Sequence, residues 1–160
     1  MSKLETPRIE NGKALLIVGL QQQYNMKTAE SIPQLWERFA PMIPKVAGSD
    51  PCVAYGVVSD VKKDSDNFSY MAGVGVSDAS RAAGELSRIN IPAQKYAIFP
   101  HRDHVSKIKD TIDAIWSQWL PKSGHVPADN PTANMIERYG EGFNPQTGMG
   151  DMEIWLAIKQ

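Results

Sequence analysis

The stretch Ser31–Phe39, which reads SIPQLWERF, has a counterpart at Thr111–Trp119, which reads TIDAIWSQW. In both stretches apolar residues recur at the spacing of one helical face, and a tryptophan is followed three residues later by a second aromatic residue. A shift of 80 residues superposes the two stretches without a gap. Because one shift aligns the phase of both helices, we interpret the chain as an internal duplication, a signal that outweighs local propensity in fold inference.

The same shift extends to the segments that flank the two predicted helices. It places Leu16 on Tyr96, each inside a short apolar run that is typical of a buried strand. Each half therefore reads strand, helix, strand, strand, with repeats at about 14–76 and 94–158. The predicted strands are Ala14–Leu20, Cys52–Asp60, Phe68–Val76, Gln94–Phe99, Ala133–Tyr139 and Met152–Ile158.

Proline and glycine set the expected ends of the two helices. Pro41 and Pro44 are expected to end the first helix, because proline removes an N–H donor and crowds the preceding turn. The second helix is expected over His104–Leu120, with Pro121 and Gly124 as its stop.

These elements predict an α+β fold made of duplicated βαββ units. Each helix has one apolar stripe, so we expect two helices to pack on one extended, mostly antiparallel sheet. A pseudo-two-fold axis is expected between the halves, and the seam between them is a natural place for a ligand cleft. The whole chain, 1–160, is expected to be a single domain, since a chain of this length can bury about 70% of its unfolded surface.

Composition excludes several classes of protein. The 17 Lys and Arg residues balance 18 Asp and Glu residues, and a net charge of -1 argues against a strongly cationic nucleic-acid binder. The single cysteine, Cys52, excludes an intramolecular disulfide framework. The N-terminus has no apolar secretory segment, and the longest purely apolar run, Ala14–Val18, is far too short to cross a membrane. We therefore expect a cytoplasmic protein with no membrane partner.

The most informative short segment is PTANMIERY, Pro131–Tyr139. A strand there places Met135, Glu137 and Tyr139 on one face. If that face is exposed, Glu137 is an ordinary surface charge. If it lines an apolar, aromatic cavity, burial is costly for the carboxylate, its pKa rises, and a cationic aromatic ligand relieves the cost. The 80-residue shift puts Val57 at the equivalent position, so we expect one half alone to carry the site.

Other motifs give weaker signals. His101 and His104 have a metal-like spacing, but no cysteine or third histidine follows closely in the sequence, and His125 falls in a predicted loop. The sequence contains no Gly-x-Ser-x-Gly elbow and no P-loop, and Gly73–Gly75 lacks the rest of a dinucleotide fingerprint. We therefore expect neither a metal nor another cofactor.

Blocks of sequence throughout the chain carry a family resemblance. They are Ile32–Phe39, Tyr55–Asp60, Phe68–Val76, Lys95–His101, Ile115–Gly124, Ile136–Pro145 and Met152–Ile158. The most specific part is the succession YAIFPH, IWSQWLP and IERY. In order and spacing these blocks resemble the GyrI-like, or AraC-type effector-binding, domain, from about Arg8 to Ile158.

The resemblance implies the duplicated βαββ fold and an aromatic pocket for diverse, often cationic and lipophilic, small molecules. It implies that the buried glutamate of that pocket is Glu137, with Tyr139 as its neighbour on the same face. Many family members carry a helix-turn-helix DNA-binding domain, for which the N-terminal 13 residues are too short, so we expect a stand-alone version without direct nucleic-acid binding. The predicted ligand-binding residues are Glu137, Tyr139, Tyr70, Phe99, Trp116, Trp36 and Trp155.

Three functions are compatible with the sequence. The favoured one is binding of cationic, lipophilic or aromatic compounds, in a role that is sequestering or similar to that of a transcription regulator. An alternative is a hydrolase of strained electrophilic natural products, in which Glu137 acts as acid or base with Tyr70 or Tyr139 assisting, so catalysis stays open. The third is interaction with a protein, as in inhibition of DNA gyrase, and a homodimer is also compatible.

Overall fold

The chain folds into two helical stretches and one sheet, and the computed structural model describes residues 4–25, 27–45, 49–61, 67–76, 86–128, 132–144 and 146–159. The strands are β1 (Arg8–Gly12), β2 (Leu15–Tyr24), β3 (Ser49–Ser59), β4 (Phe68–Val76), β5 (Ser87–Ile91), β6 (Gln94–Pro100), β7 (Met135–Tyr139) and β8 (Met152–Ala157). The first helical stretch consists of the 3-10 turn η1 (Ala29–Ser31), α1 (Ile32–Phe39) and the 3-10 turn η2 (Ala40–Lys45). The second consists of the 3-10 turn η4 (Val105–Lys107), α2 (Ile108–Ala114), the π-helical turn η5 (Ile115–Trp119) and α3 (Leu120–Ser123).

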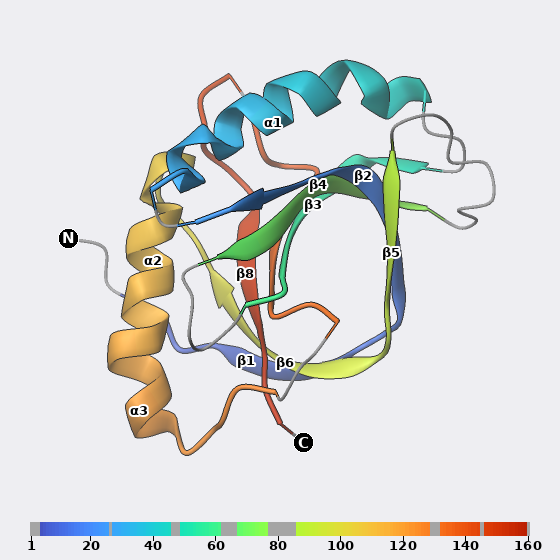
Figure 1. The fold of residues 1–160 in the computed structure, drawn as a ribbon. Coiled ribbons are helices and arrows are strands. Elements are labelled where there is room, and N and C mark those ends of the chain that lie inside the picture. The colour runs from blue at the N-terminus through green and yellow to red at the C-terminus, as the bar shows by residue number, and fades with distance from the viewer. Residues whose placement is uncertain are drawn as a thin grey trace.

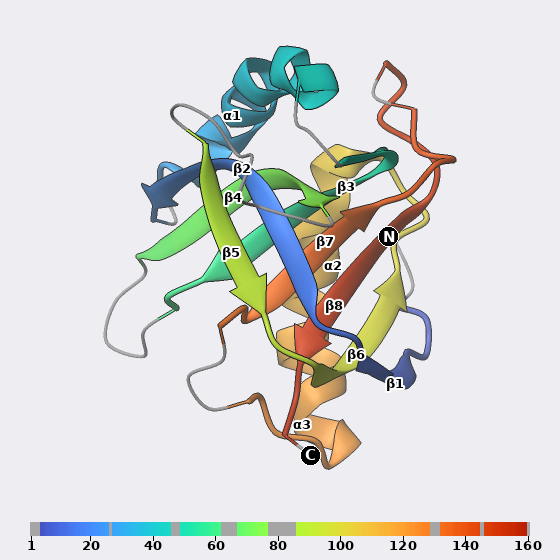
Figure 2. The same ribbon diagram turned by 90° about the vertical axis from the view of Figure 1, so that its right-hand side faces the viewer.

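The strands form one antiparallel sheet in the order β1-β6-β8-β7-β3-β4-β2-β5. The sheet curls, and both helical stretches lie outside the curl (Figures 1 and 2). Helix α1 packs on β2 and β4, and the second helical stretch packs on β6 and β8. This arrangement confirms the predicted α+β class, with two helical stretches on an antiparallel sheet.

The strand order is symmetric about the central pair β3 and β7. Moving outward, β4, β2 and β5 on one side match β8, β6 and β1 on the other. Strands β1 and β5, which add one strand to each βαββ unit, were not predicted, because RIENG and SRINI are short and mostly polar. The duplication itself remains a prediction, and this strand order supports it.

The 80-residue shift describes the helices better than the outer strands. Leu35 and Ile115, which the shift superposes, are both buried beneath their helices. Leu16 and Tyr96 instead face opposite sides of the sheet, since Leu16 packs with residues under α1 and Tyr96 lies inside the curl. A shift of one residue turns a side chain to the other face of a strand, so the gapless match of Leu16 with Tyr96 is wrong.

The helices end where the turn residues predict, with one exception. Helix α1 ends at Phe39, and Pro41 and Pro44 lie in the 3-10 turn that follows. The second helical stretch continues through Pro121, which occupies the first turn of α3, a position where proline is tolerated. The predicted stop at Pro121 is therefore wrong, and the stretch ends at Gly124, whose φ of 77° is left-handed.

None of the helices in the described part of the chain is both long enough and apolar enough to span a lipid bilayer.

Apolar side chains fill both sides of the curled sheet. On the outer side, the α1 cluster, which includes Leu35 and Phe39, lies beneath α1. The α2 cluster, which includes Phe99 and Ile115, lies beneath the second helical stretch. Val58 of β3 packs against both clusters. The inner cluster, inside the curl, includes Ile17, Met71 and Ile136. The two outer clusters therefore meet along β3 and β7, at the centre of the sheet.

Candidate functional site

Glu137 lies on β7, where the two outer clusters meet. Met135 and Tyr139 pack with the α2 cluster, whereas Ile136 belongs to the inner cluster, so side chains alternate along this strand as predicted. The Glu137 residue is 9% exposed. It is a buried carboxylate, and not the exposed surface charge that was the other interpretation of the sequence.

Two tyrosines and a tryptophan form a hydrogen-bonded chain that ends on this carboxylate. The hydroxyl of Tyr70, on β4, donates to Glu137 Oε1 at 2.7 Å, and the hydroxyl of Tyr139 donates to the same oxygen at 2.8 Å. The indole Nε1–H of Trp36, on α1, donates to the Tyr70 hydroxyl at 2.9 Å. Hydrogen bonds to a charged group contribute about 1.5–3 kcal/mol each, so this network fixes the carboxylate between α1 and β7.

Burial and hydrogen bonding act in opposite directions on the pKa of Glu137. Burial raises this pKa, and the hydrogen bonds from Tyr70 and Tyr139 lower it in part. Burial also raises the pKa of both tyrosines well above the usual value, and the Glu137 charge raises them further. Each phenol therefore keeps its proton and acts as a hydrogen-bond donor. Across the described residues, no lysine or arginine forms an ion pair with Glu137.

Aromatic rings surround the hydrogen-bonded network. The ring of Trp36 meets Tyr139 edge-on with centroids 5.5 Å apart, and Phe143, from the loop after β7, packs on Tyr139 at 5.0 Å. Tyr24 of β2 meets Tyr70 edge-on at 6.4 Å. Phe143 and Tyr24 were not among the predicted ligand-binding residues. Phe143 lies in a loop without periodicity, though close to Glu137 in sequence, and the strand that carries Tyr24 was expected to end four residues earlier.

Gly56 of β3 provides the space in which the network forms. It pairs directly with Glu137 across the β3–β7 ladder. A Cβ atom at this position would lie 2.1 Å from the Tyr70 hydroxyl oxygen and 2.8 Å from Glu137 Oε1. The 80-residue shift had matched Glu137 with Val57, but Val57 belongs to the inner cluster on the opposite side of the sheet. The residue beside the carboxylate is therefore Gly56, which sequence reasoning missed.

The other three predicted ligand-binding residues lie away from this network. Phe99 is fully buried in the α2 cluster, where it meets Trp119 edge-on at 5.0 Å. Trp116 is 41% exposed on η5. Trp155 packs against the inner cluster, with its ring 5.2 Å from that of Tyr96. The structure thus brings together four of the seven predicted residues, which are Trp36, Tyr70, Glu137 and Tyr139.

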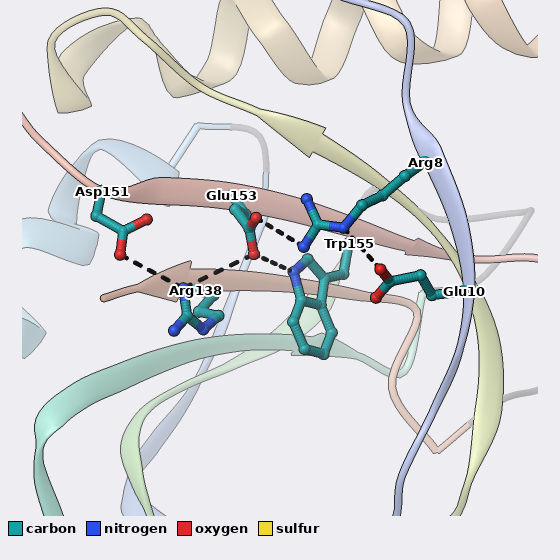
Figure 3. Close-up of polar contacts among 6 residues, drawn as sticks. All are labelled: Arg8, Glu10, Arg138, Asp151, Glu153 and Trp155. Atoms are coloured by element: carbon teal, nitrogen blue, oxygen red, sulfur yellow. Dashed lines mark hydrogen bonds and ion pairs between the residues drawn. The ribbon is translucent and has the colours of Figure 1, made fainter. Parts of the chain in front are cut away.

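Trp155 belongs to a separate polar network across β1, β7 and β8 (Figure 3). Its Nε1–H donates to Glu153 Oε1 at 3.1 Å, and Glu153 Oε2 lies 2.9 Å from Arg8 Nη2. Arg138 Nη1 lies 3.7 Å from Glu153 Oε1 and 3.6 Å from Asp151 Oδ2. Because Arg138 follows the buried carboxylate directly along β7, this network lies on the opposite side of the sheet.

The closely spaced histidines have structural partners. His101 is 2% exposed, with Nδ1 2.8 Å from Thr111 Oγ1 and Nε2 2.8 Å from the carbonyl oxygen of His104. The Nδ1 atom of His104 accepts the backbone N–H of Ser106 at 3.1 Å, and so caps the turn η4. The contact of His101 with Thr111 joins the residue that follows β6 to α2. The described residues contain no group of three or more His, Cys, Asp or Glu side chains that could hold a metal ion.

Comparison with known proteins identifies the family. The chain matches the GyrI-like small molecule binding domain over residues 5–159 and belongs to that family, which confirms the resemblance. It is 34% identical over 153 residues to the transcriptional regulator BrlR of Pseudomonas aeruginosa. That match covers 94% of this chain and 54% of the regulator, so the chain spans about half the length of this relative.

Two solved structures share the fold. The structure of SAV2435 bound to tetraphenylphosphonium superposes with a TM-score of 0.77 at 19% identity, over 97% of this chain and 94% of that one. The integron cassette protein VCH_CASS2 of Vibrio cholerae superposes with a TM-score of 0.73 at 17% identity, over 98% and 97% of the two chains.

Proposed function

We propose that this chain binds lipophilic aromatic cations at Glu137, as an effector-binding or drug-sequestering protein. The observation that carries this proposal is the Glu137 carboxylate itself. It is 9% exposed, it accepts two phenolic hydrogen bonds on one oxygen, and within the described residues it has no cationic partner. Small-molecule binding is the property of the matched family, and the cationic class of ligand, which the family resemblance implies, is part of this proposal.

The energetics of the site favour a cation over a neutral ligand. A carboxylate that loses its water without gaining a counter-charge is destabilised, which is why burial raises the pKa of Glu137. A bound cation supplies the missing charge. The rings of Trp36 and Phe143 each pack on that of Tyr139, whose hydroxyl donates to this carboxylate. A cation over the face of such a ring gains about 0.5–2 kcal/mol.

The comparisons support this class of ligand by analogy. Tetraphenylphosphonium is a lipophilic cation, and SAV2435, which has the same fold, was solved with it bound. BrlR is a transcriptional regulator, so a regulatory role for the present chain is part of the proposal. The expectations of a protein partner, such as DNA gyrase, and of a homodimer stay predictions.

Titration with tetraphenylphosphonium tests the proposal. Quenching of tryptophan fluorescence is a suitable signal, because Trp36 lies in the hydrogen-bonded network. We expect a dissociation constant of roughly micromolar order, about -8 kcal/mol. Glu137→Gln removes the charge and keeps the shape of the side chain, and it should weaken binding by about tenfold or more.

Glu141→Gln is the matched control, because Glu141 is an exposed residue in the loop after β7. This variant should bind tetraphenylphosphonium as tightly as the wild type. Equal affinity in the wild type and in Glu137→Gln would show that Glu137 is not the counter-charge, and the proposal would then be wrong.

The hydrolase alternative is favoured by the position of two phenols on one carboxylate with a raised pKa. Glu137 would take a proton from a water molecule as its oxygen bonds to a carbon of the strained ring, and the ring C–C bond would break. Tyr70 or Tyr139 would pass a proton to the released carbon and regain one from the protonated Glu137. Incubation with a cyclopropane-bearing electrophile, followed by mass spectrometry, tests this. A water adduct that forms with the wild type and not with Glu137→Gln supports it, and an unchanged substrate after long incubation at high protein concentration excludes it.

A further inference from the structure

The two oxygens of Glu137 have different surroundings. The hydroxyls of Tyr70 and Tyr139 both donate to Oε1, at 2.7 and 2.8 Å. Among the described residues, no donor is bonded to Oε2. Oε1 is therefore held by the fold, and both lone pairs of Oε2 are left for another group.

The direction of the hydrogen bonds determines where a proton binds. The indole of Trp36 can only donate, so the Tyr70 hydroxyl accepts from it and points its own proton at Glu137. The Tyr139 proton points at the same oxygen. When Glu137 is protonated, its proton therefore sits on Oε2, because Oε1 already faces two protons. When Glu137 is ionised, Oε2 is the free acceptor. A proton and a ligand donor thus compete for one atom.

We infer that the site selects cations that carry an N–H donor, such as protonated tertiary amines, over quaternary cations of the same skeleton. This inference rests on the proposed function and names its ligand class more closely. A protonated amine supplies both the counter-charge and a charge-assisted hydrogen bond to Oε2, which is about twice as strong as a neutral one. A quaternary cation supplies the charge alone, and it leaves Oε2 without a partner in a site shielded from water.

A matched pair of ligands tests the inference. One is 2-(diphenylmethoxy)-N,N-dimethylethanamine, and the other is its N-methyl quaternary salt. At about pH 7 the amine is protonated, since alkylamines have a pKa near 10. Both affinities are measured by calorimetry on the wild type, on Glu137→Gln and on the control Glu141→Gln. We expect the tertiary ammonium to bind the wild type and the control about tenfold more tightly than the quaternary salt.

The Glu137→Gln variant distinguishes the effect of the N–H hydrogen bond on affinity from the effect of the extra methyl group's size. Its amide oxygen takes the place of Oε1, because the two tyrosines require an acceptor there, and its NH₂ group takes the place of Oε2. A ligand N–H then meets a donor, so the affinity ratio should fall to about one or reverse. A preference that comes from size alone persists unchanged in this variant.

The outcomes distinguish this inference from the proposed function. Equal affinities of the two ligands for the wild type, or the same ratio in wild type and Glu137→Gln, would overturn the N–H preference and leave cation binding intact. Binding of neither ligand, or affinities that Glu137→Gln does not change at all, would contradict the proposed function. If Glu137→Gln does not fold, the N–H proton of the bound amine is observed by NMR in the wild type. A downfield-shifted, slowly exchanging signal supports the bond to Oε2. Loss of the signal through rapid exchange with water overturns it.

Discussion

Replacing Gly56 by alanine is a sharp test of how the sheet makes room for the carboxylate network. The added Cβ would lie 2.1 Å from the Tyr70 hydroxyl oxygen and 2.8 Å from Glu137 Oε1. Ordinary contact begins at 3.4 Å, so the Tyr70 hydroxyl must move by roughly 1 Å. Such a movement breaks its 2.7 Å bond to Glu137 or pushes the whole ring toward Tyr24.

The magnitude follows from opposing effects. Alanine suits a strand better than glycine by about 0.5–1 kcal/mol, which favours the variant. Overpacking costs about 1–3 kcal/mol, and loss of a hydrogen bond to a charged group costs about 1.5–3 kcal/mol. With both costs and this gain, we expect Gly56→Ala to lower the free energy of unfolding by about 1.5–5.5 kcal/mol. It should also weaken tetraphenylphosphonium binding, because Tyr70 no longer fixes the carboxylate.

Urea unfolding of three variants measures this effect. Gly75→Ala, on β4, is the matched control, because the nearest atom to its added Cβ lies at an ordinary 3.5 Å. It should leave stability unchanged or raise it slightly. Gly56→Ala combined with Tyr70→Phe removes the atom at 2.1 Å but leaves the ring carbon at 2.7 Å, so stability should recover in part. If Gly56→Ala is as stable as Gly75→Ala, the inference that the network leaves no room for a Cβ at Gly56 is wrong.

Further predictions concern charge and packing at the same site. Because burial raises the pKa of Glu137, the folded state binds more protons than the unfolded one, and stability should fall as the pH rises from the usual Glu range through the raised pKa. Urea titrations across pH should show this slope in the wild type and not in Glu137→Gln, whereas cation affinity should rise over the same window. Tyr139→Phe removes a hydrogen bond that lowers the pKa of Glu137, so the midpoint of pH-dependent cation binding should move upward, and an unmoved midpoint would count against that bond. Phe99→Ala should cost about 3–5 kcal/mol of stability, whereas the exposed Trp116→Ala should cost less than about 0.5 kcal/mol and leave cation affinity unchanged.

The sequence predicts the helices and the apolar strands better than it predicts the polar strands or the face of the sheet that a side chain takes. Helical spacing and branched runs identify both helical stretches and six of the strands, because each of these elements is apolar on at least one face. The sequence does not reveal β1 and β5, because their mostly polar residues carry no such pattern. It also matches Leu16 with Tyr96, since similarity of apolar runs does not determine which face of a strand a side chain takes.

The candidate site is predictable in its charged residue and less so in its partners. Alternation along Met135–Tyr139 places Glu137 and Tyr139 on one face, and this requires knowledge of one strand only. The contact of Tyr70 with Glu137 joins positions 67 residues apart, and it depends on the pairing of three strands. Gly56 has no side chain to signal its role, and that role becomes visible only when β3 lies against β7.

A crystal structure of the chain with tetraphenylphosphonium tests the central claim most directly. The account predicts that the cation lies beside Glu137, on the side of Oε2, with rings of the ligand against Trp36 and Tyr139, and that both phenols still donate to Oε1. A cation bound inside the curl against Trp155, or anywhere else away from Glu137, would contradict it.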